Sequence, residues 1–380
     1  LVKEAPTMTA QTPSYIPGLR DVVAAETRLS SVDGQRGELI IAGYPLEELA
    51  PNATFEQVVY LLWHDRLPDH TELVNFRDEL ASRRTLSTPT LNILRAVAEK
   101  RVPVMDAMRM AASTLSLTAE EDDDMDAALT LVAAFPTIVA AYWRLLNGDE
   151  PVAPRDDLRH AANLLYMLNG EAPDEAHARA LETYLNTVTD HGLNASTFTA
   201  RVIVSTRSDM ISAIVGALGA LKGPLHGGAP GPALDMVFEI GTKENAEPYI
   251  RNMLARGERL MGFGHRVYRV RDPRADVLNA EAQRFFAEGE GKSFYDLVRY
   301  VESVALRLLE EHKPGRNLQT NVEFYTALIL HGIGLPTEMF SPMFACGRVA
   351  GWTAHCFEQR EESQIIRPSS MYTGTKDRRW

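Results

Sequence analysis

Most hydrophobic positions along the chain recur at intervals of three and four residues, the spacing of an amphipathic helix. The clearest example starts with a capping box at residues 54–57 (Thr-Phe-Glu-Gln) and continues with apolar residues on one face as far as Leu62. We expect Leu67-Pro68 to end this helix. The same criteria predict helices at residues 156–170, 174–189, 208–221, 275–288, 294–311, 322–331 and 340–360. The pattern therefore predicts a mostly α-helical protein.

Strand patterns are few. The best candidate lies at residues 28–42, where Ser-Val-Asp-Gly is followed by Glu-Leu-Ile-Ile. This arrangement predicts one small N-terminal β-hairpin that turns at Asp33-Gly34.

The stretch 127–143 contains no charged residue and lies at the lower limit of a membrane-spanning length. It is rich in alanine, which contributes little insertion energy, and Pro136 lies near its middle. We therefore expect a buried core helix and no membrane association. The N-terminus lacks the apolar core of a secretory signal, and Cys346 and Cys356 form neither a disulfide framework nor a metal-ligand spacing. These features predict a cytoplasmic protein without a metal site.

The composition is that of a globular protein. The chain has 380 residues, of which 45% are hydrophobic and 24% charged, which excludes disordered, collagenous and coiled-coil classes. Its length favours one large or two unequal domains. The formal net charge of −12 argues against nucleic-acid binding, because phosphate contacts require an excess of basic side chains. Anionic ligands would need a local cluster of arginines.

Several well-known catalytic motifs are missing. Gly291-Lys292-Ser293 resembles the end of a phosphate-binding loop, but the first glycine of that pattern is replaced by Phe286. Gly262-Phe263-Gly264 lacks the third glycine of a dinucleotide-binding fingerprint. The chain also lacks His-Glu-x-x-His, Cys-x-x-Cys and Gly-x-Ser-x-Gly. Nicotinamide redox chemistry, zinc hydrolysis and serine hydrolysis therefore have no support in the sequence.

Candidate chemistry lies instead at three junctions between predicted helices, at residues 222–232, 261–273 and 313–321. The first contains His226 within Gly-Pro-Leu-His-Gly-Gly, and the second contains His265 within Gly-Phe-Gly-His-Arg. Glu323 follows the third, at a predicted helix start. Taken singly, a histidine in a turn is more often a structural hydrogen-bonding group, and a glutamate in a first turn is usually a partner of the helix dipole. The three together favour a functional site.

Basic residues are concentrated around the second junction. Residues 256–274 contain six arginines and only two acidic residues, although the whole chain is acidic. A solvated basic helix end would also give this composition, but the glycines around His265 favour a site for an anion, since planar guanidinium groups match carboxylates and phosphates.

Two histidines, one carboxylate and a group of arginines suit proton abstraction beside a carbonyl group, followed by carbon–carbon bond formation. The difficult step is to form an enolate near neutral pH. A carboxylate whose pKa is raised by apolar surroundings and a neutral donor aimed at the developing oxyanion would both help.

At these residues the sequence resembles the citrate synthase family. The matching motifs are Gly-Pro-Leu-His-Gly-Gly at 223–228, Gly-Phe-Gly-His-Arg-Val-Tyr at 262–268, Asp-Pro-Arg at 272–274 and Asn-Val-x-Phe-Tyr at 321–325. Residues 191–198, Gly-Trp-Thr-Ala-His at 351–355 and Arg367-Pro368 extend the match. The resemblance runs from about Tyr15 to the C-terminus. It implies a two-domain helical fold, with a large domain at 1–225 and 329–380 and a small domain at 226–328 that closes over the substrates.

The resemblance also implies the reaction, in which acetyl-CoA, oxaloacetate and water give citrate and CoA through an enol or enolate and citryl-CoA. Glu323 would take a proton from the acyl methyl group of acetyl-CoA. His226 would donate to the thioester oxygen, and His265 would polarise the ketone of oxaloacetate. Acetyl-CoA would be a co-substrate, with no permanently bound cofactor.

Other positions acquire binding roles from the same resemblance. The oxaloacetate carboxylates would be held by His191, Arg274, Arg348 and, in a homodimer, Arg367 of the partner subunit. Asn194 and Ser196 would orient His226. The residues expected to contact CoA are Met261, Gly262, Phe263, Gly264 and Arg269, with Lys313 and Arg316 as weaker candidates.

Two departures from the family pattern stand out. The family usually has aspartate where this chain has Glu323, and a displacement of one methylene can lower a rate roughly a hundredfold unless the backbone compensates. The family often continues its Gly-Gly-Ala with Asn-Glu-Ala, whereas this chain has Pro230 and Pro232, which we expect to stiffen the turn after His226.

Two other functions stay open at this point. One is 2-methylcitrate synthesis from propionyl-CoA, because an extra methyl group changes binding in an apolar pocket by only about 1–3 kcal/mol. The other is a catalytically weak homologue that binds CoA or dicarboxylates, an alternative raised by Glu323.

Overall fold

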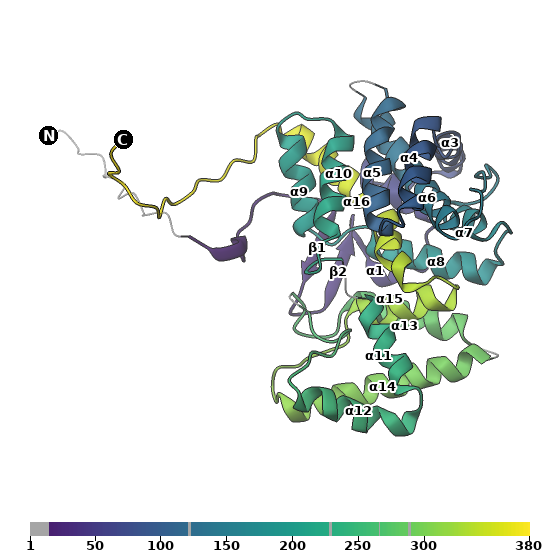
Figure 1. Cartoon of the computed structure of the whole chain (residues 1–380), viewed down its shortest axis with the longest axis vertical. Helices are drawn as coiled ribbons and strands as arrows, with labels where there is room; N and C mark the ends of the chain where they lie inside the picture. The colour runs from purple at the N-terminus through teal and green to yellow at the C-terminus, as the bar shows by residue number, and fades with distance from the viewer. Residues whose placement is uncertain (1–14, 121–122, 228–229, 266, 288–289) are drawn as a thin grey trace.

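The structure is a computed structural model that describes residues 15–120, 123–227, 230–265, 267–287 and 290–380 (Figure 1). Over these ranges it is mostly α-helical, with a single small sheet, as predicted. The helices are α1 (Leu46–Leu49), α2 (Phe55–His64), α3 (His70–Ser82), α4 (Thr88–Glu99), α5 (Val104–Ala112), α6 (Asp124–Leu146), α7 (His160–Asn169), α8 (Glu175–Val188), α9 (Ala195–Ser205), α10 (Met210–Leu221), α11 (Pro230–Ile240), α12 (Lys243–Ala255), α13 (Pro273–Phe285), α14 (Glu290–His312), α15 (Val322–Gly332) and α16 (Phe340–Glu362). Short 3-10 turns lie at Pro17–Leu19, Ser113–Leu117 and Thr337–Met339.

The capping box at the start of α2 is present. The Thr54 hydroxyl accepts a hydrogen bond from the backbone N–H of Gln57, and the Gln57 side chain accepts one from the N–H of Thr54. The helix ends at His64, three residues before the predicted Leu67, because Asp65 adopts the left-handed conformation with φ 59°. The start was therefore predicted correctly and the end was not.

Two other predicted boundaries also shift. The helix predicted at 156–170 begins only at His160, and Arg84 donates to the carbonyl groups of Arg155 and Leu158 in the preceding segment (2.6 and 3.0 Å). The helix predicted from residue 275 begins at Pro273, which suits a first helical position because proline lacks an N–H group. Pro232, expected to stiffen the turn after His226, lies instead in the first turn of α11, where proline is tolerated.

The remaining predicted helices correspond to α8, α10, α14, α15 and α16, whereas α1, α3, α4, α5, α9, α11 and α12 were not predicted. Helix α9 shows the reason. Its sequence is rich in threonine and valine, whose helix propensity is modest, so packing against α10 and α16 stabilises it.

Helix α6 contains the uncharged stretch 127–143. It is long and apolar enough to cross a membrane, but 78% of its most apolar window is buried inside the protein. It packs against α4, α5, α7 and α16. The stretch is therefore a core helix, as predicted, and its central Pro136 lies inside the helix.

The hairpin predicted at 28–42 is present and gains a third strand. Strand β1 (Ser30–Asp33) pairs antiparallel with β2 (Glu38–Ile41), which pairs with β3 (Tyr44–Pro45). In the connecting turn, Asp33 accepts hydrogen bonds from the N–H groups of Gln35 and Arg36. The turn lies against the junction 261–273, because Arg269 N–H donates to the carbonyl oxygen of Gly34 (2.7 Å).

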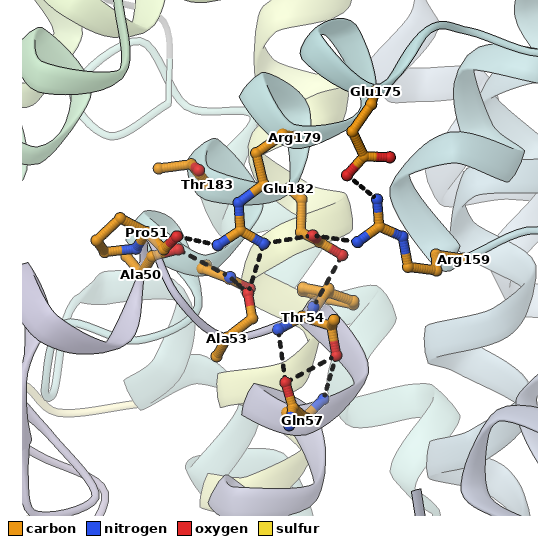
Figure 2. A network of polar contacts seen from close by, with 12 residues as sticks. Ala50, Pro51, Ala53, Thr54, Gln57, Arg159, Glu175, Arg179, Glu182 and Thr183 are labelled. Atoms are coloured by element: carbon orange, nitrogen blue, oxygen red, sulfur yellow. Dashed lines mark hydrogen bonds and ion pairs between the residues drawn. The ribbon is translucent and has the colours of Figure 1, made fainter. Parts of the chain in front are cut away.

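A buried polar network attaches α8 to the start of α2 (Figure 2). Glu182 is 1% exposed, accepts hydrogen bonds from Arg159 and Arg179, and lies 3.4 Å from the backbone nitrogen of Phe55. Arg179 also donates to the carbonyl groups of Pro51 and Ala53. The network orients α8, which leads directly to the turn that contains His191.

Helices α11 to α15 form the lower part of the molecule in Figure 1. Helix α12 packs against α14, and α13 and α15 pack together and against α8 of the upper part. The C-terminal segment after α16 and the first described residues extend away from the body on the same side (Figure 1). The division into a large and a small domain at 226 and 328 stays a prediction.

Candidate active site

The predicted catalytic residues and three of the four predicted carboxylate-binding residues come from five segments that are distant in sequence. His191 follows α8, His226 follows α10, and His265 precedes α13. Glu323 is the second residue of α15, and Arg348 lies within α16.

A short main-chain pairing brings the segments of His265 and Glu323 together. The N–H of Gly264 donates to the carbonyl of Gln319 (2.7 Å), and the N–H of Asn321 donates to the carbonyl of Gly262 (3.0 Å). Asn321 caps α15 by accepting from the N–H of Glu323 (3.0 Å), and its amide donates to the carbonyl of Gly264 (2.9 Å). Gly262 has φ +86°, and a Cβ there would lie 2.9 Å from the Phe324 ring, so this close approach requires glycine.

Arg274 is held by a buried carboxylate. Its Nε and Nη2 atoms donate to the two oxygens of Asp272 (3.0 and 2.8 Å), and the side chains are 5% and 1% exposed. Asp272 also accepts from the N–H of Val322, the residue before Glu323 (3.2 Å). This carboxylate therefore fixes Arg274 relative to the start of α15.

Both ring nitrogens of His265 face donors. The N–H groups of Val267 and Tyr268 point at Nδ1 (3.1 and 3.2 Å). Arg274 Nη2, which can only donate, lies 3.2 Å from Nε2. His265 and the cation of Arg274 therefore lie side by side, an arrangement suited to an anionic or carbonyl oxygen.

His191 completes this side of the site. Its Nε2 atom lies 3.1 Å from the hydroxyl of Tyr268, and its ring centroid lies 5.7 Å from that of His265. Burial lowers the pKa of His191 well below its usual value, and the charge of Arg274 acts in the same direction. His191 is therefore neutral at physiological pH.

Glu323 has the electrostatic properties of a general base. Burial raises its pKa to about 7, while the charge of Arg274 opposes that rise. A carboxylate with this pKa is partly ionised at neutral pH and also accepts a proton readily.

Arg348 is a buried cation on α16. It is 1% exposed, its Nε donates to the carbonyl of Val188 (2.6 Å), and its guanidinium lies 4.6 Å from the centroid of the Phe344 ring. Burial lowers its pKa to about 10, and the charge of Asp190 acts in the opposite direction. Arg348 therefore stays protonated at neutral pH and can bind a carboxylate.

His226 is oriented by the two residues predicted for that task. Its Nε2 atom lies 2.8 Å from the hydroxyl of Ser196, which in turn lies 2.8 Å from Oδ1 of Asn194. Burial lowers the pKa of His226 to about 4, and the charge of Arg348 acts in the same direction. This histidine is therefore neutral at physiological pH and can act as a neutral hydrogen-bond donor.

Electrostatic coupling joins these residues into one cluster. The charge of Arg274 acts on His191 and Glu323. The charge of Arg348 acts on His191 and His226. The structure thus brings together the predicted residues from all five segments, with His226 linked to the others through Arg348.

The predicted CoA contacts divide into two groups. Phe263 is 8% exposed and its ring packs against Phe324, so it belongs to the core rather than to an open binding surface. Arg269, Lys313 and Arg316 are exposed. Arg269 lies beside the segment that contains Lys313 and Arg316, because the amide of Asn317 in that segment donates to the carbonyl of Arg269 (2.7 Å).

Arg367 lies apart from the cluster within its own chain. It is exposed on the C-terminal segment, and the preceding N–H of Ile366 donates to Ser205 at the end of α9 (3.0 Å). Arg266 and Gly228, which belong to the sequence motifs, lie outside the described residues. Within the described ranges, no group of three or more His, Cys, Asp or Glu side chains is placed to hold a metal ion.

No role for Tyr268, Asp272 or Trp352 was predicted from the sequence. All three lie within quoted motifs, but nothing in the spacing separates a residue that supports a site from one that packs. Tyr268 contacts both His191 and His265, and its buried ring lies 5.9 Å from the Arg274 guanidinium.

Comparison with known proteins identifies the family of the chain. Residues 18–369 match the sequence model of the family described as "Citrate synthase, C-terminal domain". Citrate synthase of Haloferax volcanii is 42% identical over 95% of this chain and 96% of its own, and 2-methylcitrate synthase of Mycobacterium tuberculosis is 37% identical over 98% and 94%. The solved ternary complex of Thermoplasma acidophilum citrate synthase with carboxymethyl coenzyme A and oxaloacetate is 29% identical, with a TM-score of 0.87 over 97% of this chain and 98% of that one. The chain therefore belongs to the citrate synthase family.

Proposed function

We propose that this chain condenses acetyl-CoA with oxaloacetate and water to give citrate and CoA. The observation that carries the proposal is the position of Glu323, with its pKa raised to about 7, on the same cluster as two histidines and two buried arginines. Enolate formation needs such a base together with donors for the developing negative charge.

In the proposed reaction, Glu323 removes a proton from the methyl carbon of acetyl-CoA, and His226 donates a hydrogen bond to the thioester oxygen. The resulting enol or enolate carbon attacks the ketone carbon of oxaloacetate. His265, whose Nδ1 accepts from two backbone N–H groups, is proposed to polarise that ketone through Nε2 and to stabilise the new alkoxide. Water then cleaves the thioester of citryl-CoA, which releases citrate and CoA.

Oxaloacetate is proposed to bind through its two carboxylates. Arg274 and Arg348 are buried cations with fixed guanidinium groups, and the charges of both lower the pKa of His191. Arg367 is proposed to reach the site of a partner subunit in a homodimer, in keeping with its exposed segment that extends from the body (Figure 1).

Acetyl-CoA is proposed to act as a co-substrate that binds along the exposed surface that carries Arg269, Lys313 and Arg316. Residues 226–328 are proposed to form the small domain that closes over both substrates. We also propose a cytoplasmic location, because Cys346 and Cys356 are free and buried, as expected of thiols in a reducing compartment.

The second candidate is condensation of propionyl-CoA, favoured by the similarity to a 2-methylcitrate synthase. The decisive assay mixes purified protein with oxaloacetate and either acetyl-CoA or propionyl-CoA and measures the release of CoA thiol. Faster release from acetyl-CoA supports the main proposal, and the opposite order supports the second candidate. No release from either would point to a binding protein with little catalytic activity.

Glu323→Gln tests the base directly. It is expected to abolish turnover and to leave the dissociation constant for oxaloacetate nearly unchanged, since the carboxylates are proposed to bind elsewhere. Turnover at the wild-type rate would refute the assignment of Glu323.

The proposed role of Arg367 has its own test. Co-expression of Arg367→Ala and Glu323→Gln chains would produce mixed dimers in which one site has both Glu323 and the partner's Arg367. Random mixing should then restore about a quarter of wild-type activity, by the symmetry of a two-site dimer. No restored activity would show that Arg367 serves its own chain.

A further inference from the structure

We infer that His355 is a positioning residue for His191, and that it acts through the buried carboxylate of Asp190. The inference rests on the proposed condensation, in which His191 helps to hold a carboxylate of oxaloacetate. It adds a fully buried residue of α16 to the group that prepares the oxaloacetate site.

The carboxylate of Asp190 holds the backbone next to His191. Its Oδ2 atom accepts hydrogen bonds from the hydroxyl of Ser30 (2.5 Å) and from the N–H of Gly192 (3.3 Å). The N–H of Gly192 also donates to the hydroxyl oxygen of Ser30 (2.8 Å). Because Asp190 and Gly192 are the two neighbours of His191 in the chain, these contacts fix the direction in which the His191 side chain leaves the turn.

Helix α16 packs closely against this turn along one of its faces. Arg348, Gly351 and His355 lie on that face, at positions i, i+3 and i+7. A Cβ at Gly351 would lie 2.9 Å from Oδ1 of Asp190, so the absence of a side chain there permits the close approach. One turn further along, Nε2 of His355 lies 3.1 Å from the same oxygen. The helix face that carries Arg348 therefore also holds the turn of His191.

The hydrogen of His355 can be assigned from its neighbours. Arg201 can only donate, and its Nη1 atom lies 3.0 Å from Nδ1 of His355, so Nδ1 is the acceptor. The ring hydrogen then lies on Nε2 and points at Asp190. Glu358 lies 3.7 Å from Nδ1, beyond hydrogen-bond distance, and itself accepts from Arg201 (2.9 Å). His355 is therefore a donor to the carboxylate of Asp190.

Asp190 depends on this donor because it is shielded from water. Asp190 and His355 are both 0% exposed. Burial raises the pKa of Asp190, but the contact with His355, the charge of Arg348 and the hydrogen bond from Ser30 outweigh this effect, and the pKa lies below its usual value. The carboxylate is therefore ionised. Loss of the His355 donor would leave its Oδ1 atom unsatisfied, so the carboxylate and the turn that it holds should shift.

Two amide substitutions separate the roles of the two ring nitrogens. The glutamine side chain can place its NH₂ group near the position of Nε2, so His355→Gln keeps a donor for Asp190. The shorter asparagine side chain reaches only the position of Nδ1, so His355→Asn keeps an acceptor for Arg201 and loses the donor to Asp190. Both substitutions replace the buried ring by a neutral amide, so a role in packing alone predicts that glutamine gives no rescue.

The first measurement is the binding of oxaloacetate by calorimetry. His355→Asn is expected to raise the dissociation constant at least about tenfold, the loss that corresponds to one hydrogen bond to a charged group. His355→Gln should stay within about threefold of the wild type. His160→Asn, which removes another buried histidine at the start of α7, should leave oxaloacetate binding unchanged. Equal dissociation constants for the two His355 variants, or an equal rise in His160→Asn, would overturn the inference.

Kinetics should show the same division. His355→Asn should raise KM for oxaloacetate and keep kcat at saturating oxaloacetate within about fivefold of the wild type, because the base Glu323 is unchanged. In a double-mutant cycle on oxaloacetate binding, His355→Asn should add little to Asp190→Asn, since His355 acts through Asp190. A loss confined to kcat, or additive losses in the cycle, would contradict this role.

The last measurement needs neither turnover nor substrate. The ¹⁵N NMR spectrum of histidine-labelled protein at pH 7 reports which ring nitrogen carries hydrogen, with His355 and His191 assigned by the signals lost in His355→Gln and His191→Asn. Wild-type His355 should carry hydrogen on Nε2, and the signals of His191 should move in His355→Asn but not in His355→Gln. Hydrogen on Nδ1 of His355, or His191 signals that stay fixed in His355→Asn, would refute the inference. These results hold even if the wild type fails the CoA-release assay, and the wild-type tautomer holds even if His355→Asn does not fold.

Discussion

Asp272 and Arg274 form a two-point ion pair in an almost fully buried position, with N–O distances of 3.0 and 2.8 Å. The same carboxylate accepts from the N–H of Val322, so it connects the arginine to the helix that begins beside Glu323. One acidic side chain therefore positions a proposed carboxylate-binding group relative to the proposed base.

Asp272→Asn should weaken oxaloacetate binding and lower stability. Removal of one partner of a buried ion pair costs about 3–5 kcal/mol, because the other charge is left without compensation. We expect the dissociation constant for oxaloacetate, measured by calorimetry, to rise at least about tenfold, together with a lower Tm. Asp276→Asn is the control, since Asp276 lies on α13, is 51% exposed and pairs with Arg271, which precedes that helix. Equal effects of the two substitutions would contradict the prediction.

The pKa of Glu323, raised to about 7, predicts the pH dependence of the reaction. The base must be ionised, so kcat/KM for acetyl-CoA should fall about tenfold per pH unit below pH 7 and level off above it. Glu323→Asp should lower kcat by up to about a hundredfold because the carboxylate is withdrawn by one methylene. Steady-state rates between pH 5 and 9 test both expectations, and a flat profile down to pH 5 would exclude Glu323 as the base.

The same pKa predicts an effect on stability. An unfolded glutamate has a pKa of about 4.3, so between pH 4.3 and 7 the folded protein retains a proton that the unfolded chain has lost. Ionisation of Glu323 therefore lowers stability as pH rises through this range. Glu323→Gln should raise Tm relative to the wild type at pH 8, and this difference should shrink towards pH 4. Thermal melts of both proteins at the two pH values would reveal the opposite trend if the carboxylate were favourably paired.

Gly34→Ala should disturb the loop that contains His265. A Cβ at this position would lie 2.3 Å from the carbonyl oxygen of Val267, although Gly34 does not require positive φ. A shift of about 1 Å in a reacting group can lower a rate roughly a hundredfold, so we expect kcat/KM to fall at least about tenfold. Gly231→Ala is the control, because its Cβ would make only an ordinary 3.8 Å contact with Thr337. Wild-type kinetics in Gly34→Ala would mean that the hairpin turn does not position the loop.

The network in Figure 2 should contribute to stability and not to chemistry. Glu182→Gln removes the buried charge that faces Arg159 and Arg179, and we expect a loss of about 3–5 kcal/mol in the free energy of unfolding. Glu175→Gln should cost less than about 1 kcal/mol, since the Glu175 side chain is 76% exposed. Denaturant titration measures both, and similar losses would contradict the assignment.

The sequence by itself determined the helical class, the small hairpin, the core helix around Pro136 and the motifs that contain His226, His265 and Glu323. These features depend on local spacing, turn residues and capping groups, which act over a few residues. Helices such as α9 and boundaries such as the start of α7 were missed because packing and long-range contacts, including those of Arg84, decide them.

Only the tertiary structure decided how the site is assembled and tuned. Two backbone N–H groups point at Nδ1 of His265 while Arg274 lies beside Nε2, and burial raises the pKa of Glu323 against the charge of Arg274. The hydrogen bond from Trp352 to Ser196 joins residues 156 positions apart. Such contacts depend on three-dimensional packing of distant segments, and sequence spacing carries no record of their distances or burial.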